Sequence, residues 1–201
     1  MYEAYWPIAL LIYYIVVFVV AFAWRSLLVY RRSGINPLVL PSSADAYGYV
    51  ARAFKVTIAG IATVVIAMAL SPASQNYFGR WTVLSTPALA YLGWALLIAT
   101  LVWLVIAQVQ MGTSWRIGID DKHRTELVQH GLFTRSRNPI FLAMRINLLG
   151  LFLVFPAAVT LALLVAGEIL MQVQVRLEEK HLENLHGAAY DAYRAKVRRW
   201  L

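Results

Sequence analysis

Long uncharged runs of apolar residues constrain this chain more than any other feature. The stretch from Tyr5 to Trp24 carries no charged side chain, and neither does the stretch from Trp81 to Trp115. A helix needs about 20 apolar residues to cross the hydrocarbon core of a bilayer, so both runs are long enough to span it. Composition agrees, because only 14% of the 201 residues are charged, against about 25% in soluble domains. The chain is therefore expected to lie in a membrane.

Helix-breaking residues between the apolar runs predict an all-α, polytopic membrane bundle of about five transmembrane helices. We expect single spans over 5–24, 56–70 and 84–108, and a helical hairpin over 140–175. Pro156 divides the hairpin into two arms, because proline breaks a helix interior. A short amphipathic helix over 188–197 ends in Arg198, Arg199 and Trp200, which suits an anchor at the membrane interface. The expected parts are an N-terminal transmembrane part over 1–111 and a second part over 112–201 that holds the polar motifs.

Lysine and arginine side chains gather in alternate connections. Five follow the first span, one follows the second, five lie between 112 and 139, and six follow Val175. The positive-inside rule then places the N-terminus outside and the polar motifs in the cytoplasm, as in a bacterial inner membrane protein. The net charge of +8 is thus explained by topology and lipid headgroups, which argues against nucleic acid as a partner.

Two polar segments hold the candidate site residues. The first runs from Gly131 to Phe141, where Pro139 fits the first position of a helix and sets Arg135 and Arg137 at its mouth. The second begins at Arg176. The chain has no cysteine, and its histidines show no metal-binding spacing, so no metal site is expected.

An acidic residue inside the hairpin, Glu168, allows two interpretations. Acids within membrane spans are costly and mark functional sites by default. Glu168 could equally pair with Arg145 on the facing arm and serve the packing of the bundle. The residues alone leave this open.

The two polar segments together resemble the isoprenylcysteine carboxyl methyltransferase family, and most closely its small bacterial branch. The resemblance rests on Gly131-x-Phe133-x-x-x-Arg137-Asn138-Pro139-x-Phe141, Arg176-x-Glu178-Glu179-x-x-Leu182, Gly187-x-x-Tyr190-x-x-Tyr193 and Val197. It implies an integral membrane methyltransferase that uses S-adenosyl-L-methionine, with a catalytic core over 112–201. The acceptor would be a small lipophilic or lipid-like molecule that enters from the bilayer.

The resemblance also implies roles for particular residues. Catalytic roles fall to Arg137, Asn138 and Glu179. An arginine suits the carboxylate of S-adenosyl-L-methionine, and acids suit its ammonium or ribose hydroxyls. The residues expected to bind this cofactor are Glu126, Leu127, Val128, Gly131, Phe133, Arg135, Pro139, Arg176, Glu178, His181, Tyr190 and Tyr193. The residues expected to bind the acceptor are Phe141, Arg145, Asn147 and Glu168.

Two other functions are compatible with the sequence. One is an NADPH-dependent reductase of the sterol reductase type, which would need a larger cofactor site and shows no glycine-rich phosphate loop here. The other is a non-catalytic scaffold or lipid-binding protein. Binding of S-adenosylhomocysteine, of NADPH or of neither separates the three.

Overall fold

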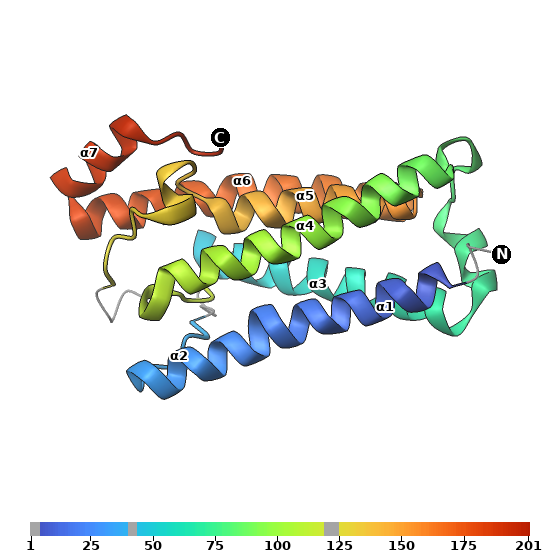
Figure 1. Ribbon diagram of the computed structural model, residues 1–201, viewed down its shortest axis with the longest axis horizontal. Helices are drawn as coiled ribbons and strands as arrows, with labels where there is room; N and C mark the ends of the chain where they lie inside the picture. The colour runs from blue at the N-terminus through green and yellow to red at the C-terminus, as the bar shows by residue number, and fades with distance from the viewer. Residues whose placement is uncertain (1–4, 40–43, 119–124) are drawn as a thin grey trace.

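The computed structural model describes residues 5–39, 44–118 and 125–201, and these form a bundle of long helices (Figure 1). The helices are α1 (Trp6–Val17), α2 (Arg25–Ser33), α3 (Ala46–Leu70), α4 (Pro87–Met111), α5 (Pro139–Val154), α6 (Ala158–His186) and α7 (Ala188–Lys196). A π-helical segment, Phe18–Trp24, joins α1 to α2 in one continuous rod. The predicted all-α membrane bundle is confirmed.

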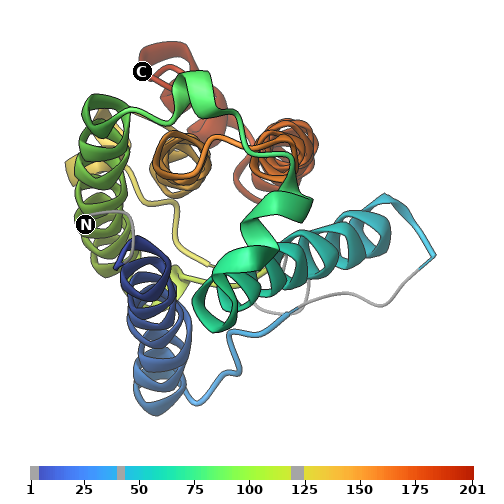
Figure 2. The ribbon, with the colours of Figure 1, turned by 90° about the vertical axis from the view of Figure 1, so that its right-hand side faces the viewer.

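Four helical stretches are long and apolar enough to cross a membrane, namely Trp6–Ser33, Ala46–Leu70, Pro87–Ser114 and Ala158–His186. The fifth, α5, has 16 residues, so it is about 24 Å long and shorter than a typical hydrocarbon core of about 30 Å. It lies between α4 and α6, inside the bundle (Figure 2).

One end of the bundle holds the ends of α2, α4 and α6, the starts of α3 and α5, and all of α7 (Figure 1). Most of the described arginines and lysines are at this end, which we call the basic end. The N-terminus and the turns between α3 and α4 lie at the opposite end. The alternation of basic connections in the sequence therefore corresponds to the alternation of helix directions in space.

Two of the predicted boundaries shift for reasons of capping. Helix α3 begins ten residues before the apolar run, because the Asp45 carboxylate accepts a hydrogen bond from the backbone N–H of Gly48 at 2.9 Å and caps the helix. Its added turns include Arg52 and Lys55. The first rod runs past Trp24 to Ser33, where Gly34 ends it in the left-handed conformation.

The hairpin predicted around Pro156 is confirmed. Helix α5 ends at Val154, α6 begins at Ala158, and the Pro156 carbonyl accepts a hydrogen bond from the N–H of Trp81 at 2.8 Å. This bond holds the turn against the connection between α3 and α4.

Glycines let α4, α5 and α6 approach one another closely. A Cβ added to Gly93 of α4 would lie 2.8 Å from the Gly150 carbonyl of α5, and one added to Gly167 of α6 would lie 2.2 Å from Leu148. Close backbone approach at small residues is a common way for membrane helices to pack, because van der Waals contact rather than the hydrophobic effect holds them together in lipid. The resulting three-helix unit fixes the positions from which the motif residues project.

Candidate active site

The two motif segments meet at Glu179. Its carboxylate, on α6, accepts hydrogen bonds from Arg137 at 2.9 Å and from Arg199 at 3.0 and 2.8 Å. Arg137 lies just before α5, and Arg199 follows α7. Glu179 is buried, and a buried carboxylate is tolerated where cations and hydrogen bonds compensate its lost hydration. The carboxylate of Glu179 in turn raises the pKa of Arg199.

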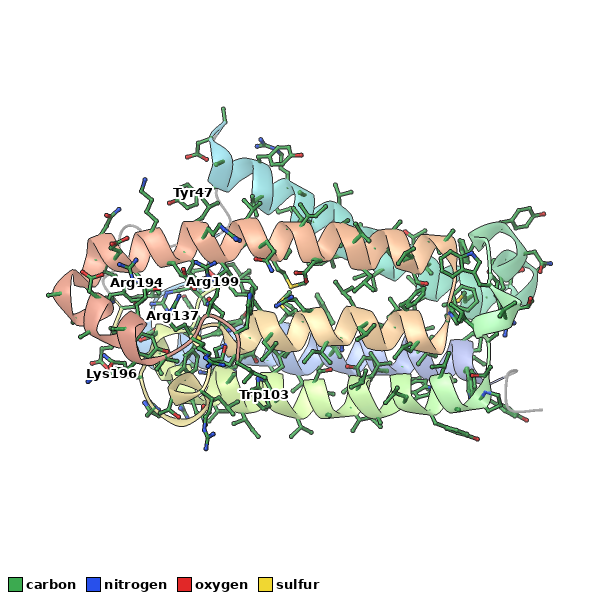
Figure 3. All side chains as sticks on the ribbon, turned by 90° about the horizontal axis from the view of Figure 1, so that it is seen from above. Tyr47, Trp103, Arg137, Arg194, Lys196 and Arg199 are labelled. Carbon is green, nitrogen blue, oxygen red and sulfur yellow. The ribbon has the colours of Figure 1, made fainter. Side chains whose placement is uncertain are left out.

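Residues 197–200, which we call the tail, fold back over this cluster (Figure 3). The Arg137 guanidinium donates to the carbonyl of Val197 at 2.7 Å, and its backbone N–H donates to the carbonyl of Arg198 at 2.9 Å. Ser136 and Asn138 both donate to the Arg199 carbonyl at 3.2 Å. The short Ser136-Arg137-Asn138 run thus binds the tail backbone along its length.

The last aromatic residue of the tail covers a second ion pair. Arg145 and Glu168 form a bridge at 2.5 and 2.9 Å, and the Arg145 guanidinium lies 4.2 Å from the ring centre of Trp200. The ending that we expected to anchor in the interface is instead packed against α5 and α6. The pairing of Glu168 with Arg145, one of the two alternatives left open by the sequence, is present.

The loop Gly131–Thr134 is held by the end of α4. The Gln110 side chain accepts a hydrogen bond from the N–H of Leu132 at 2.7 Å, and a Cβ on Gly131 would lie 2.3 Å from it. Gly131 also has φ +61°, a conformation that glycine adopts most readily. The space left by the missing side chain is therefore used by Gln110.

Helix α7 closes the other side of the loop. The Tyr193 hydroxyl donates to the Phe133 carbonyl at 2.7 Å. Burial raises the pKa of Tyr193 to about 12, and burial together with the Glu179 carboxylate raises that of Tyr190 to about 12. Both phenols are therefore neutral at physiological pH, and that of Tyr193 donates to the loop.

A cavity opens where these segments meet, and we call it the motif cavity. Its wall includes residues 125–128, three motif residues before α5 and three residues of α6. The predicted site residues among its lining are Glu126, Leu127, Val128, Phe133, Arg137, Asn138, Glu178, His181 and Tyr193. Met111, Ser114, Arg116, Gly118, Thr125 and Leu182 complete it.

Two further cavities lie next to one another between the motif cavity and the interior of the bundle. The bridging cavity shares Arg116 and Gly118 with it and reaches Lys55, Phe141 and Gln174. The apolar cavity shares Phe22, Phe54, Ile58, Leu104 and Met144 with the bridging cavity. Its volume is about 350 Å³, within the range of small-molecule sites.

The apolar cavity has a few polar groups at its wall. Asn147 accepts a hydrogen bond from Tyr14 at 3.2 Å and donates to the Tyr13 hydroxyl and to Thr100. The hydroxyl of Tyr13 donates to the Leu97 carbonyl at 2.8 Å. Because these groups bond to one another, they present little polarity to the cavity, which suits a hydrocarbon chain.

Several predicted site residues lie outside the three cavities. Arg135 is exposed, and Arg176 donates back along α6 to Gln172. Pro139 is buried at the first turn of α5, and its carbonyl accepts from Trp103 at 3.0 Å. Glu179, Tyr190, Gly131, Arg145 and Glu168 also do not line a cavity. Of the predicted acceptor residues, Phe141 lines the bridging cavity and Asn147 the apolar one.

Three residues that matter here were not predicted. Arg199 was interpreted as part of an interfacial anchor, and no local pattern links it to Glu179, 20 positions away. Gln110 and Arg116 lie at the end of an uncharged run and just beyond it. Their polarity was the only available signal, and it did not distinguish them from ordinary helix-end residues.

The residues of the motif cavity fit S-adenosyl-L-methionine chemically. Glu126 and Glu178 supply acceptors for an ammonium and for ribose hydroxyls, whereas Arg137 and His181 supply N–H donors for a carboxylate. Leu127, Val128, Phe133 and Leu182 offer apolar contact to a base. No group of acids and histidines that could hold a metal ion occurs among the described residues.

A comparison with family models identifies the family of the chain. Residues 89–189 match the phospholipid methyltransferase model. The match covers half of the chain and reaches from α4 to the first turn of α7, so it contains the first motif segment and the part of the second that lies on α6. A comparison with curated proteins finds no match. The chain therefore belongs to the phospholipid methyltransferase family, one of the membrane methyltransferases related to isoprenylcysteine carboxyl methyltransferase.

Proposed function

We propose that this membrane methyltransferase uses S-adenosyl-L-methionine and methylates a lipophilic acceptor at the cytosolic face of the membrane. The observation that carries the proposal is the adjacency of the three cavities. Motif residues line the first, Arg116 and Gly118 belong to both the motif and bridging cavities, and the bridging cavity shares five lining residues with the apolar one. In this proposal a donor with polar groups and an acceptor with a hydrocarbon chain meet where these cavities adjoin.

The donor, when bound, supplies a methyl group on a sulfonium that an acceptor atom displaces in line. The chain must therefore align the two molecules and exclude water, because alignment supplies much of the rate of such reactions. In this proposal Glu178 and Glu126 bind the ammonium and ribose, and Arg137 and His181 face the carboxylate. Asn138 lines the same cavity, and in this proposal it contacts the reacting groups.

Glu179 takes a different role from the one expected of a catalytic group in direct contact with substrate. Glu179 faces two arginines and not the cavity, so we propose that it positions Arg137. Arg137 then links the cavity wall to the tail. In this proposal Tyr190 and Gly131 support the residues that line the motif cavity, without lining it themselves.

The acceptor would reach the bridging cavity from the bilayer between α3 and α6. Near the opposite end of the bundle these helices touch, because a Cβ on Gly60 would lie 3.1 Å from Leu163. Toward the basic end α3 inclines away from the other helices (Figure 2), and residues from both α3 and α6 line the bridging cavity there. The excess of lysine and arginine at this end supports a cytosolic orientation.

The test is a calorimetric titration of S-adenosylhomocysteine into the detergent-solubilised protein, with NADPH in parallel. We expect saturable binding of S-adenosylhomocysteine alone. Glu178→Gln should weaken it about tenfold, as expected for loss of a hydrogen bond to a charged group. Glu183→Gln is the matched control, because Glu183 lies one turn further along α6 and pairs with Arg194 outside the cavity.

Binding of NADPH alone would favour a reductase, and binding of neither by the folded protein would favour a non-catalytic lipid-binding role. If the Glu178 and Glu183 variants weakened S-adenosylhomocysteine binding equally, the motif cavity would not be the binding site.

A further inference from the structure

An arginine in the first rod is buried against the end of α4. Arg25 follows the π-helical segment directly and is only 5% exposed. The positive-inside rule accounts for Arg31 and Arg32, which are exposed further along the rod. It does not account for a buried cation, because loss of hydration is costly, and charges buried within membrane-spanning helices mark functional sites by default.

The charge of Arg25 is compensated by carbonyls of α4 and not by an acid. Its guanidinium nitrogen Nη2 donates to the carbonyls of Gln108 and Gly112, both at 2.6 Å. No aspartate or glutamate pairs with Arg25 in the part of the chain that the structure describes. The last four carbonyls of a helix lack intrahelical partners and carry the negative end of its dipole, so a cation stabilises them. Arg25 therefore caps the C-terminal end of α4.

Gln108 joins the same two helices a second time. Its side-chain amide donates to the Ala21 carbonyl, within the π-helical segment, at 2.9 Å. Ala21, Arg25 and Gln108 are all buried, so water does not compete for these hydrogen bonds, which are stronger in such surroundings. The end of α4 is thus fixed to the first rod by both the side chain and the carbonyl of one residue.

The same end of α4 carries the contact to the motif loop. Gln110 lies between the two residues whose carbonyls Arg25 binds, and its side chain accepts the N–H of Leu132 at 2.7 Å. This contact has little room to adjust, since a Cβ on Gly131 would lie 2.3 Å from the Gln110 side chain. Phe133, the next residue of the loop, lines the motif cavity. A displacement of the helix end would therefore reach the cavity wall.

We propose that Arg25 is a positioning residue of the cofactor site and acts through Gln110 on the loop Gly131–Thr134. The inference rests on the proposed function, because it takes the motif cavity as the site of S-adenosyl-L-methionine. Arg25 itself lines none of the three cavities. The inference gives a role in cofactor binding to the first rod, which lies outside the residues 89–189 that match the family model.

The experiment titrates S-adenosylhomocysteine into the detergent-solubilised full chain and its variants by calorimetry. Arg25→Gln removes the charge, Gln110→Ala removes the loop contact, and a third variant combines the two changes. Arg25→Lys is the conservative replacement, because an ammonium also presents several donors on one nitrogen. Arg31→Gln is the matched control, because Arg31 is an exposed arginine of the same rod and lines none of the three cavities.

Hydrogen exchange, followed by mass spectrometry, measures the loop itself without a ligand. We expect peptides that cover residues 131–134 to exchange faster in Arg25→Gln and in Gln110→Ala than in the wild type, because the Leu132 N–H loses its fixed acceptor. Peptides from α5 and α6 should exchange as in the wild type. Faster exchange throughout the bundle in Arg25→Gln would show a merely structural role and overturn the proposal.

We expect Arg25→Gln to weaken S-adenosylhomocysteine binding about threefold or more, near the lower end of the coupling between residues of one hydrogen-bonded network. Arg25→Lys should bind with intermediate affinity, and Arg31→Gln should bind like the wild type. The double variant should bind about as weakly as the weaker of the two single variants, because both changes act on one contact.

Losses that multiply in the double variant would overturn the proposal, since Arg25 would then act independently of Gln110. Unchanged binding in Arg25→Gln, or an equal loss in the Arg31 variant, would also overturn it. If Arg25→Gln does not fold, Gln110→Ala decides, because unchanged affinity and loop exchange in that variant would leave Arg25 no contact through which to act. A wild type that does not bind S-adenosylhomocysteine would overturn the proposed function as well, whereas the other outcomes overturn this inference alone.

Discussion

Arg199 and Arg137 both bind the carboxylate of Glu179. Arg199 binds both oxygens of Glu179, at 3.0 and 2.8 Å, and Arg137 binds one of them at 2.9 Å. The arginine of the motif is thus tied to the tail by a shared acid as well as by its bonds to the tail backbone. Because Arg137 also lines the motif cavity, the tail helps to set the shape of the site.

Arg199→Ala should therefore affect cofactor binding from outside the cavity. The Arg199 side chain is 35% exposed, so screening limits the loss of stability to about 1–2 kcal/mol. We expect several-fold weaker binding of S-adenosylhomocysteine by calorimetry, with partial rescue by Arg199→Lys. Arg198→Ala is the control, because the Arg198 side chain is exposed. Unchanged binding in Arg199→Ala would show that Arg137 keeps its place without the tail.

Filling the apolar cavity should separate acceptor binding from donor binding. Ala62 of α3 lines this cavity, and Ala62→Phe adds an aromatic ring there. We expect methyl transfer to lipid extracts to fall at least about tenfold, measured with radiolabelled donor, while S-adenosylhomocysteine still binds. Ala59→Phe is the control, because Ala59 is exposed on the same helix and lines none of the cavities. A similar loss of methyl transfer in both variants would show that the effect comes from disturbed packing of α3 and not from filling the cavity.

Hydrophobicity and charge were sufficient to predict the helices, because a membrane span depends on its own composition. They were not sufficient for the ends of α3 and α1. Helix α3 begins earlier than predicted because Asp45 caps it. The first rod continues as α2 through a segment that includes Arg25, Arg31 and Arg32. The π-helical segment depends on tertiary contacts: the Ala21 carbonyl within it accepts a hydrogen bond from Gln108 of α4 at 2.9 Å.

The site was predictable where a residue lies in a local motif and faces the cavity, as Glu178 and His181 do. Motif membership alone did not separate Glu178, which lines the cavity, from its neighbour Glu179, which faces two arginines. One step along a helix turns a side chain by about 100°, and the sequence does not say which of two adjacent acids faces the cavity. The contact of Arg199 with Glu179 depends on how the tail folds back, which no spacing encodes.

The glycine contact between α4 and α5 should be intolerant of a single methyl group. Gly93→Ala would bring a Cβ to 2.8 Å from the Gly150 carbonyl and from Val154, which are backbone and packed groups that cannot move independently. We expect a loss of about 1–3 kcal/mol, seen as a lower unfolding temperature in detergent. Gly60→Ala is the control, because its Cβ would meet only the end of the Leu163 side chain, at 3.1 Å. Equal stability of the two variants would contradict the assigned packing.

Alkaline pH should weaken the attachment of α7 to the motif loop through Tyr193. Its pKa is about 12 in the folded chain and about 10 when free. Between these values the unfolded chain releases its proton first, so stability contributed by this phenol is complete below pH 10 and falls as pH rises toward 12. The total loss from this group is about 3 kcal/mol, since each pKa unit corresponds to about 1.4 kcal/mol. Thermal unfolding of the wild type and Tyr193→Phe, compared from pH 8 to 11, measures it.

At pH 8 the Tyr193→Phe variant should be less stable by about 1 kcal/mol, because it lacks the hydrogen bond to the Phe133 carbonyl. As pH rises above 10, the difference should shrink and then reverse, since the variant has no phenol to ionise at this position. Tyr77→Phe is the control, because Tyr77 is 88% exposed, and it should follow the wild type throughout. A constant difference between wild type and Tyr193→Phe over the whole range would show that the Tyr193 hydroxyl is not buried against the loop.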